Sequence, residues 1–336
     1  MRYMERERIK RGMCGILLAV CMAVFLCGCQ IGSTQIVVSG TIGNKQVFKI
    51  GGRNCGLKEA RVYLTNYQNI YGTAYTIDLW QHDFGDDSLV TYVKDLTLDE
   101  LTRVYCMALL AESRGIALSE EEAGKVSEAA KEYYVSLSQE ERDYLSVSEI
   151  EIKEYYGRYA LSQKLYNSLT SEVDEEVSDD EARVMEIMQI YVEDADKAAE
   201  VARKLSDGDD FAAVANNYNR LPAIQVTVSR DDLLQEVEDV AFQMDNGEIS
   251  GMIPVENGYY FIKCLNKYNE ELTQANKSNI VEKREKEAFD DVYNEFVSSL
   301  HSYINEDLWE ELEMDTSGMI RTGSFFEIFY KYCSDI

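Results

Sequence analysis

The spacing of apolar residues changes near residue 180, and this change constrains the fold more than any other feature of the sequence. From Leu57 onward, apolar and aromatic side chains recur three and four positions apart, which predicts amphipathic helices. Between residues 180 and 268 the apolar stretches are brief, and turn residues separate them. From about residue 273 a long charged helix is expected. The chain is therefore expected to be α+β, with a small sheet domain inserted between mostly helical regions.

The N-terminal region is expected to be mainly helical. Weak alternation over residues 35–50 predicts short strands with a Gly-Asn turn. The predicted helices cover residues 57–74, residues 97–111, a segment after the capping box that Ser119 opens, a short connection at residues 139–142, and residues 146–169. Because the tail at 325–332 is rich in aromatic residues, we expect it to dock on the N-terminal region rather than remain in solvent.

The sequence pattern of the middle region predicts strands and helices in the order β-α-α-β-α-β-β. Gly208 is expected to end the first helix, and Asp209 to cap the second. The predicted elements are strand 184–192, helices 196–205 and 209–217, strand 223–228, helix 232–244, and strands 253–255 and 259–265. This order predicts a small α+β domain with an antiparallel sheet.

The N-terminal sequence is typical of an export signal. Basic residues precede an apolar run from Ile16 to Leu26, which is too short to span a membrane. The run ends in Leu26-Cys27-Gly28-Cys29, which resembles the bacterial lipobox. That resemblance implies cleavage after residue 28 and lipidation of Cys29, so that acyl chains anchor the protein to the outer face of the cell membrane. The alternative is an ordinary signal peptide or short anchor that happens to contain cysteines.

The charge of the chain limits its partners. The net charge is −28, and removing residues 1–28, with 5 basic and 2 acidic residues, leaves −31. Such a chain repels phosphate backbones, so nucleic acid is not expected as a partner. The cysteines Cys55, Cys106, Cys264 and Cys333 show no metal-ligand spacing, and we expect no metal and no cofactor. Free thiols are favoured slightly over disulfides, whose pairing the sequence does not determine.

Two motifs in the middle region carry a resemblance to a known family. The first lies at 188–218, where an Ala-rich helix pattern is followed by Leu-Ser-Asp-Gly-Asp-Asp-Phe and ends at Tyr218. The second combines Ala-Phe-Gln-Met-Asp-Asn-Gly-Glu-Ile-Ser at 241–250 with Gly-Tyr-Tyr-Phe-Ile-Lys at 258–263. Together they resemble the opening and the close of parvulin-type peptidyl-prolyl isomerase domains.

The resemblance implies an active site that this chain does not reproduce. The two histidines that parvulins carry on neighbouring strands fall on Gln189 and Tyr260, and an acidic position falls near Ile224. The Met and Phe of the proline pocket fall on Leu233 and Val237, and Phe242 is a further candidate for peptide binding. No histidine occurs between residues 83 and 300. We therefore expect weak or no isomerase activity, and no confident catalytic residue.

The whole layout resembles extracytoplasmic foldase lipoproteins, in which chaperone-like helices surround a parvulin domain. The expected segments are a signal peptide (1–28), a tether with a short strand (29–46), a helical chaperone-like region (47–175), a parvulin-like domain (180–268) and a C-terminal helix with its tail (273–336). The expected function is an extracytoplasmic, membrane-anchored chaperone or foldase that binds unfolded or nascent secreted polypeptides. The alternatives are an active isomerase with an atypical site and a non-enzymatic surface lipoprotein for assembly or ligand capture.

Overall fold

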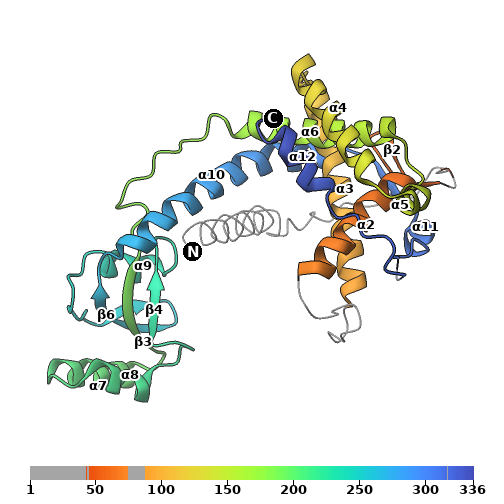
Figure 1. Ribbon diagram of the computed structural model, residues 1–336. Coiled ribbons are helices and arrows are strands. Elements are labelled where there is room, and N and C mark those ends of the chain that lie inside the picture. Colours follow the sequence, from red (N-terminus) through yellow and green to blue (C-terminus); the bar gives the residue numbers. More distant parts are fainter. Residues whose placement is uncertain (1–42, 44, 75–87, 316) are drawn as a thin grey trace, which may run out of the picture. The chain divides into compact units, whose positions relative to one another are not determined.

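The computed structural model describes residues 43, 45–74, 88–315 and 317–336. The signal segment, Cys29, the possible strand before residue 43 and Asn44 of the Gly-Asn turn lie outside these residues. Within the described part, helices predominate and the two sheets are small and antiparallel (Figure 1). The predicted α+β class is therefore confirmed.

The chain divides into two compact units, and we describe each by itself. Of the described residues, the helical unit includes those from 43 to 113, from 118 to 160 and from 295 to 335, and the small unit includes residues 161–294. The helical unit is thus assembled from both ends of the sequence. Helices α6 (Glu149–Thr170) and α10 (Glu270–Ser298) belong partly to each unit.

The helical unit contains a three-stranded sheet in the order β2-β1-β7. Strand β1 (Gln46–Ile50) pairs with β2 (Arg53–Gly56) through a tight turn, and on its other edge with β7 (Ser302–Ile304). The sequence patterns predicted neither β2 nor β7. The unit's helices are α2 (Leu57–Ala74), α3 (Leu89–Ser113), α4 (Glu120–Ser136), α5 (Gln139–Leu145), the first half of α6, α11 (Glu306–Glu310) and α12 (Phe325–Cys333).

Helices α4 and α5 begin with capping boxes. Ser119 and Ser138 each accept a hydrogen bond from a backbone N–H three residues later, and a glutamate side chain at that position accepts one in return. Each box satisfies donors that a helix start leaves unpaired. The predicted helix start at Ser119 is therefore confirmed.

The aromatic tail forms α12 and packs among the helices of the N-terminal region. Phe325 is fully buried, and its ring lies 5.2 Å from that of Tyr63, 5.2 Å from that of Tyr133 and 4.3 Å from that of Tyr156. The Phe325 backbone N–H also donates to Asn66 Oδ1 at 3.1 Å. The expected docking of the tail is confirmed.

A buried ion pair also joins helices of this unit. Glu59 on α2 is 2% exposed, and its carboxylate accepts two hydrogen bonds from the Arg158 guanidinium on α6, at 2.6 and 3.2 Å. The Tyr105 hydroxyl on α3 donates to the same carboxylate at 2.6 Å. Bidentate pairing and the extra donor satisfy a carboxylate that burial would otherwise destabilise.

The small unit has a four-stranded antiparallel sheet in the order β4-β3-β6-β5. Its elements are β3 (Met185–Val192), α7 (Ala195–Ser206), α8 (Phe211–Tyr218), β4 (Gln225–Val228), α9 (Gln235–Ala241), β5 (Ile253–Val255) and β6 (Gly258–Asn266). One face of the sheet packs against α9, and the other packs against α7 and α8 (Figure 1). The predicted order of elements is confirmed.

Two helix predictions in the small unit require correction. The cap of α8 is Asp210, whose carboxylate accepts from the Ala213 N–H at 2.9 Å, and not Asp209. The reason is that Gly208, at φ +89°, and Asp209 complete the reversal after α7. The predicted helix 232–244 is only α9, because Asp232 instead accepts hydrogen bonds from Ser229 in a turn before it.

Candidate functional site

Two polar side chains meet on the face of the small sheet that α9 covers. Side chains alternate along β3, so Gln189 shares a face with the core residue Ile187. On β6, Ile262 lies opposite Gln189, and Tyr260 is two positions away on the same face. The neighbouring central strands therefore place Gln189 and Tyr260 diagonally beside each other.

These two residues line a pocket of about 720 Å³, a size typical of small-ligand sites. Its walls come from β3, β4 and β6 and from the turn and helix that follow β4. The lining residues are Gln189, Leu221, Val226, Thr227, Val228, Asp231, Asp232, Leu233, Leu234, Val237 and Tyr260. Six of the eleven lining residues are Leu or Val, so one wall of the pocket can accept an apolar ring while the polar groups orient it.

Gln189 is a buried polar residue with one free acceptor. The residue is only 8% exposed, and its Nε2 donates to the Ala223 carbonyl at 3.2 Å. Because the partner is a carbonyl, the bonded atom must be the amide nitrogen. Among the described residues no group donates to Gln189 Oε1, so this oxygen is available to a ligand in the pocket.

Tyr260 contributes a phenol to the same pocket. Its ring lies 4.9 Å from that of Tyr191, whose hydroxyl donates to the Asn257 carbonyl at 2.6 Å. Partial burial, and then the proximity of Tyr191, raise the pKa of Tyr260. The phenol therefore stays neutral at physiological pH, and in the described part of the chain its hydroxyl has no hydrogen-bond partner.

The structure brings together four of the six positions suggested by the motifs. Gln189, Tyr260, Leu233 and Val237 all line the pocket, and Val237 is 1% exposed. Ile224 does not line it, because its side chain packs with the cluster on the opposite sheet face.

Phe242, the sixth position, also lies outside the pocket lining. Its ring fills the core behind α9, with the guanidiniums of Arg183 and Arg230 at 4.9 and 4.2 Å from the ring centroid. It therefore supports the domain and does not face a ligand in this pocket.

The motif comparison missed the rim of the pocket. Asp231 and Asp232 lie in the turn that Ser229 begins, and Leu234 follows them with 52% of its surface exposed. The segment around Ile224 is shortened and lacks the family's glycines, so the alignment through the following turn was loose by a residue or two. Two aspartates in a row before an apolar pair were the available signal, since Asp favours turns.

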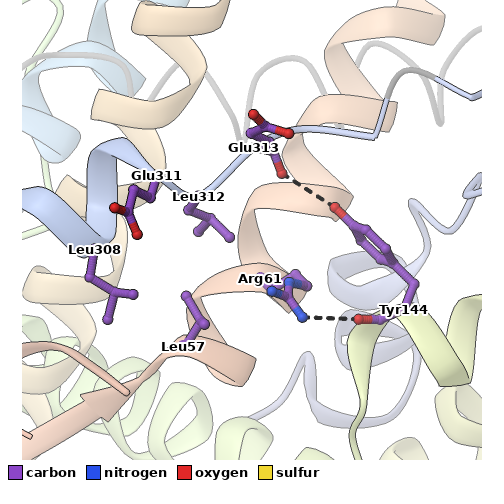
Figure 2. Close-up of a pocket in the computed structure, with 7 residues that line it drawn as sticks. All are labelled: Leu57, Arg61, Tyr144, Leu308, Glu311, Leu312 and Glu313. Atoms are coloured by element: carbon purple, nitrogen blue, oxygen red, sulfur yellow. Dashed lines mark hydrogen bonds between the residues drawn. The ribbon is translucent and has the colours of Figure 1, made fainter. Parts of the chain in front are cut away.

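A second, smaller pocket of about 350 Å³ lies in the helical unit (Figure 2). The Arg61 guanidinium donates to the Tyr144 carbonyl at 3.1 Å, and the Tyr144 hydroxyl donates to the Glu313 carbonyl at 3.3 Å. Leu57, Leu308, Glu311 and Leu312 complete the lining. No sequence pattern indicated this pocket, because residues distant in the chain form it.

Neither a metal cluster nor a reactive thiol stands out in the parts of the chain that can be described. No group of three or more His, Cys, Asp or Glu side chains there is placed to hold a metal ion. Cys55, Cys106, Cys264 and Cys333 are buried and form no disulfide with one another. Burial raises the pKa of each thiol for which a shift is resolved, to about 11 for Cys333. Across the same residues, no helix has the length and apolar character to span a membrane.

The sheet, its helices and the pocket agree with a comparison to known families. Residues 147–277 match the family of the PPIC-type peptidyl-prolyl isomerase (PPIASE) domain. Residues 147–277 therefore carry a parvulin-type domain, as the motifs indicated.

Its relatives are named as foldases. It is 25% identical to the foldase protein PrsA of Caldanaerobacter subterraneus over 201 residues, or 56% of this chain and 62% of that one. It is also 25% identical to foldase protein PrsA 3 of Bacillus cereus over 213 residues, or 60% of this chain and 64% of that one. The chain thus spans between half and two thirds of the length of these relatives. A crystal structure of a PrsA peptidylprolyl isomerase from Bacillus cereus covers 74% of this chain and 96% of its own, with 21% identity and a TM-score of 0.38.

Proposed function

We propose that this protein is an extracytoplasmic foldase or chaperone that binds unfolded secreted chains and is held at the membrane by a lipid on Cys29. In this proposal residues 1–28 are a signal peptide and residues 29–46 a tether. Residues 47–175 and 273–336 form the chaperone-like region, and residues 180–268 form the prolyl-binding domain. The foldase relatives, the lipobox-like Leu26-Cys27-Gly28-Cys29 and the acidic charge support it.

The observation that carries the proposal is the pocket beside Gln189 and Tyr260. An apolar wall that includes Leu233 and Val237 suits a proline ring. The free Gln189 oxygen and the Tyr260 hydroxyl suit the N–H and carbonyl groups of an extended peptide. Binding of proline segments therefore needs no histidine, although the family's site has two.

Catalysis is a stricter requirement than binding. Rotation about a prolyl peptide bond crosses a barrier of about 20 kcal/mol, and an enzyme must stabilise the twisted amide more than the planar one. At the two positions where the family has histidines, this chain offers a neutral amide and a neutral phenol. We propose that the domain binds prolines with weak or no isomerase activity.

An isomerisation assay on residues 30–336 tests the catalytic part. The expected result is cis/trans exchange of a proline peptide that is at most marginally faster than exchange in buffer. A Gln189→Ala/Tyr260→Phe variant is the matched control, because it removes both polar groups while retaining the apolar wall. Strong turnover that this variant loses would show an active enzyme with an atypical site, a possibility favoured by the unpaired Tyr260 hydroxyl.

Suppression of aggregation of an unfolded client tests the chaperone part. Residues 30–336 should delay the aggregation of a chemically unfolded secreted protein at near-equimolar ratio. Leu233→Asp should weaken the delay, whereas Leu272→Asp, an exposed site outside the pocket lining, should not. No delay together with no turnover would favour a surface lipoprotein of another class.

A further inference from the structure

The rim of the prolyl pocket carries negative charge that nothing in the described structure neutralises. Asp231 and Asp232 are both exposed and both line the pocket, while none of the lining residues is Lys or Arg. Asp231 has a left-handed backbone (φ +67°), and its own N–H donates to Glu238 Oε2 at 2.8 Å. Its carboxylate has no ion-pair or hydrogen-bond partner among the described residues.

The neighbouring charges do not cancel this rim. Asp232 Oδ2 accepts from the Ser229 N–H and hydroxyl, both at 2.7 Å, but serine is neutral, so these contacts supply no opposite charge. Arg230, next in sequence, is engaged elsewhere. Its guanidinium pairs with Asp180 at 3.0 Å and with Glu238 at 3.5 Å, and it lies over the Phe242 ring.

The interior of the pocket indicates, independently of the rim, which hydrogen-bonding group a ligand must have. Gln189 is more than nine-tenths buried, its Nε2 donates one N–H to the Ala223 carbonyl, and no group among the described residues donates to its Oε1, so this oxygen remains as an acceptor for a ligand. A ligand that pairs with this oxygen must supply a hydrogen-bond donor inside the pocket and tolerate two carboxylates at the entrance. An extended peptide with a cationic side chain beside its apolar ring supplies both.

We propose that the pocket selects proline segments in which Lys or Arg is adjacent to the proline. This inference rests on the proposed function and narrows it to a substrate class. Two unit charges about 6 Å apart in water attract by roughly 0.7 kcal/mol, so each aspartate favours a Lys peptide over an Ala peptide by about threefold at low salt. Salt near 1 M shortens the screening length to about 3 Å and removes the preference.

The test measures the binding of three labelled peptides, with Lys, Ala or Glu before the same proline, to residues 30–336 at low salt. Fluorescence anisotropy gives the affinities, and NMR shifts of the Gln189 and Tyr260 signals show where the peptides bind. The expected order is Lys above Ala above Glu. Asparagine can adopt the left-handed backbone that this position requires. Asp231→Asn should therefore lower the ratio of the affinities for the Lys and Ala peptides about threefold.

Asp196→Asn is the matched control, because it removes the same charge from an exposed site on α7, which packs on the other sheet face. It should leave the ratio unchanged. Equal losses in both variants would attribute the preference to the overall charge and overturn the inference. If Asp231→Asn folds poorly, Asp232→Asn provides a second test, and it should lower the ratio of the affinities for the Lys and Ala peptides in the same way.

The outcomes separate the inference from the function on which it rests. If all three peptides shift Gln189 and Tyr260 with equal affinity, the pocket binds proline and the charge selection is wrong. If none of the three shifts either residue, prolyl binding at this pocket is itself wrong.

Discussion

The hydroxyl of Tyr156 donates a 2.6 Å hydrogen bond to the backbone carbonyl of Phe325, and the two ring centroids lie 4.3 Å apart. Tyr156 lies in α6 and Phe325 begins α12, so one polar and one apolar contact join segments 169 residues apart. Both rings are fully buried. The stability of the helical unit therefore depends on the end of the chain.

Truncation of Phe325 should destabilise the helical unit strongly. Phe325→Ala removes a buried ring that contacts three tyrosines, and such changes cost about 3–5 kcal/mol of unfolding free energy. Tyr156→Phe removes only the hydrogen bond and should cost about 1 kcal/mol. Urea unfolding measures both, with Met319→Ala, at a 65% exposed site, as the control. A loss below 1 kcal/mol for Phe325→Ala would contradict this packing.

Alkaline pH should loosen the same unit through Tyr133. Burial raises the pKa of Tyr133 to about 12, although Asn66 and Thr322 donate to its hydroxyl. Because the folded pKa lies above the usual value near 10, this contribution to stability is complete below pH 10 and is lost as pH rises toward 12. The urea midpoint, measured at pH 8, 10 and 11, should fall less steeply with rising pH in Tyr133→Phe than in the unsubstituted protein. An unchanged slope would indicate that Tyr133 does not titrate in this range.

Restoring histidines should raise isomerase activity. Gln189→His/Tyr260→His places imidazoles at the two positions where the family has them. Two hydrogen bonds worth about 1 kcal/mol each correspond to an acceleration of about tenfold or more in peptide exchange, measured by NMR. The single substitutions are the controls. No gain would mean that the shortened segment around Ile224, rather than the missing imidazoles, limits the chemistry.

A charge in the apolar wall should abolish prolyl binding. Leu233→Asp places a carboxylate where the pocket is expected to hold the proline ring, and affinity should fall at least about tenfold, because the ligand would have to desolvate that charge. Since Leu233 is only partly buried, the domain should still fold, which circular dichroism can check. Leu272→Asp should bind normally, and equal weakening by both variants would place the binding site elsewhere.

Anchoring should depend on one cysteine. Cys29→Ser should prevent labelling with a fatty-acid analogue in bacterial cells and release the protein from the membrane fraction, because the thiol that accepts the lipid is gone. Cys27→Ser, two residues away, should leave both unchanged. Membrane retention of an unlabelled Cys29→Ser protein would favour an uncleaved N-terminal anchor.

Local signals predicted the small unit well because its elements begin and end at residues with strong backbone preferences. Gly208 and the aspartates around it marked the α7 and α8 boundaries to within a residue. The turn at Ser229 was missed, since Asp231 and Asp232 also suit a helix start. Strand β7 was missed because three residues show no periodicity.

The candidate site was only partly predictable for a related reason. Motifs located Gln189 and Tyr260, because the residues that carry the resemblance flank both positions in the sequence. Phe242 was misplaced, since spacing cannot tell whether a side chain faces a pocket or the core behind it. The Arg61 pocket depends on contacts between segments that only the fold brings together.

The pairing of β1 with β7 has a consequence for the order of folding. The edge of β1 stays open until Ser302–Ile304 have been synthesised, and the site for Phe325 stays empty until α12 follows. The main segment of the small unit, residues 161–294, precedes β7 and Phe325 in the chain and can fold before them. A foldase of the kind proposed above would thus keep apolar surfaces of its own helical unit uncovered until β7 and α12 are in place.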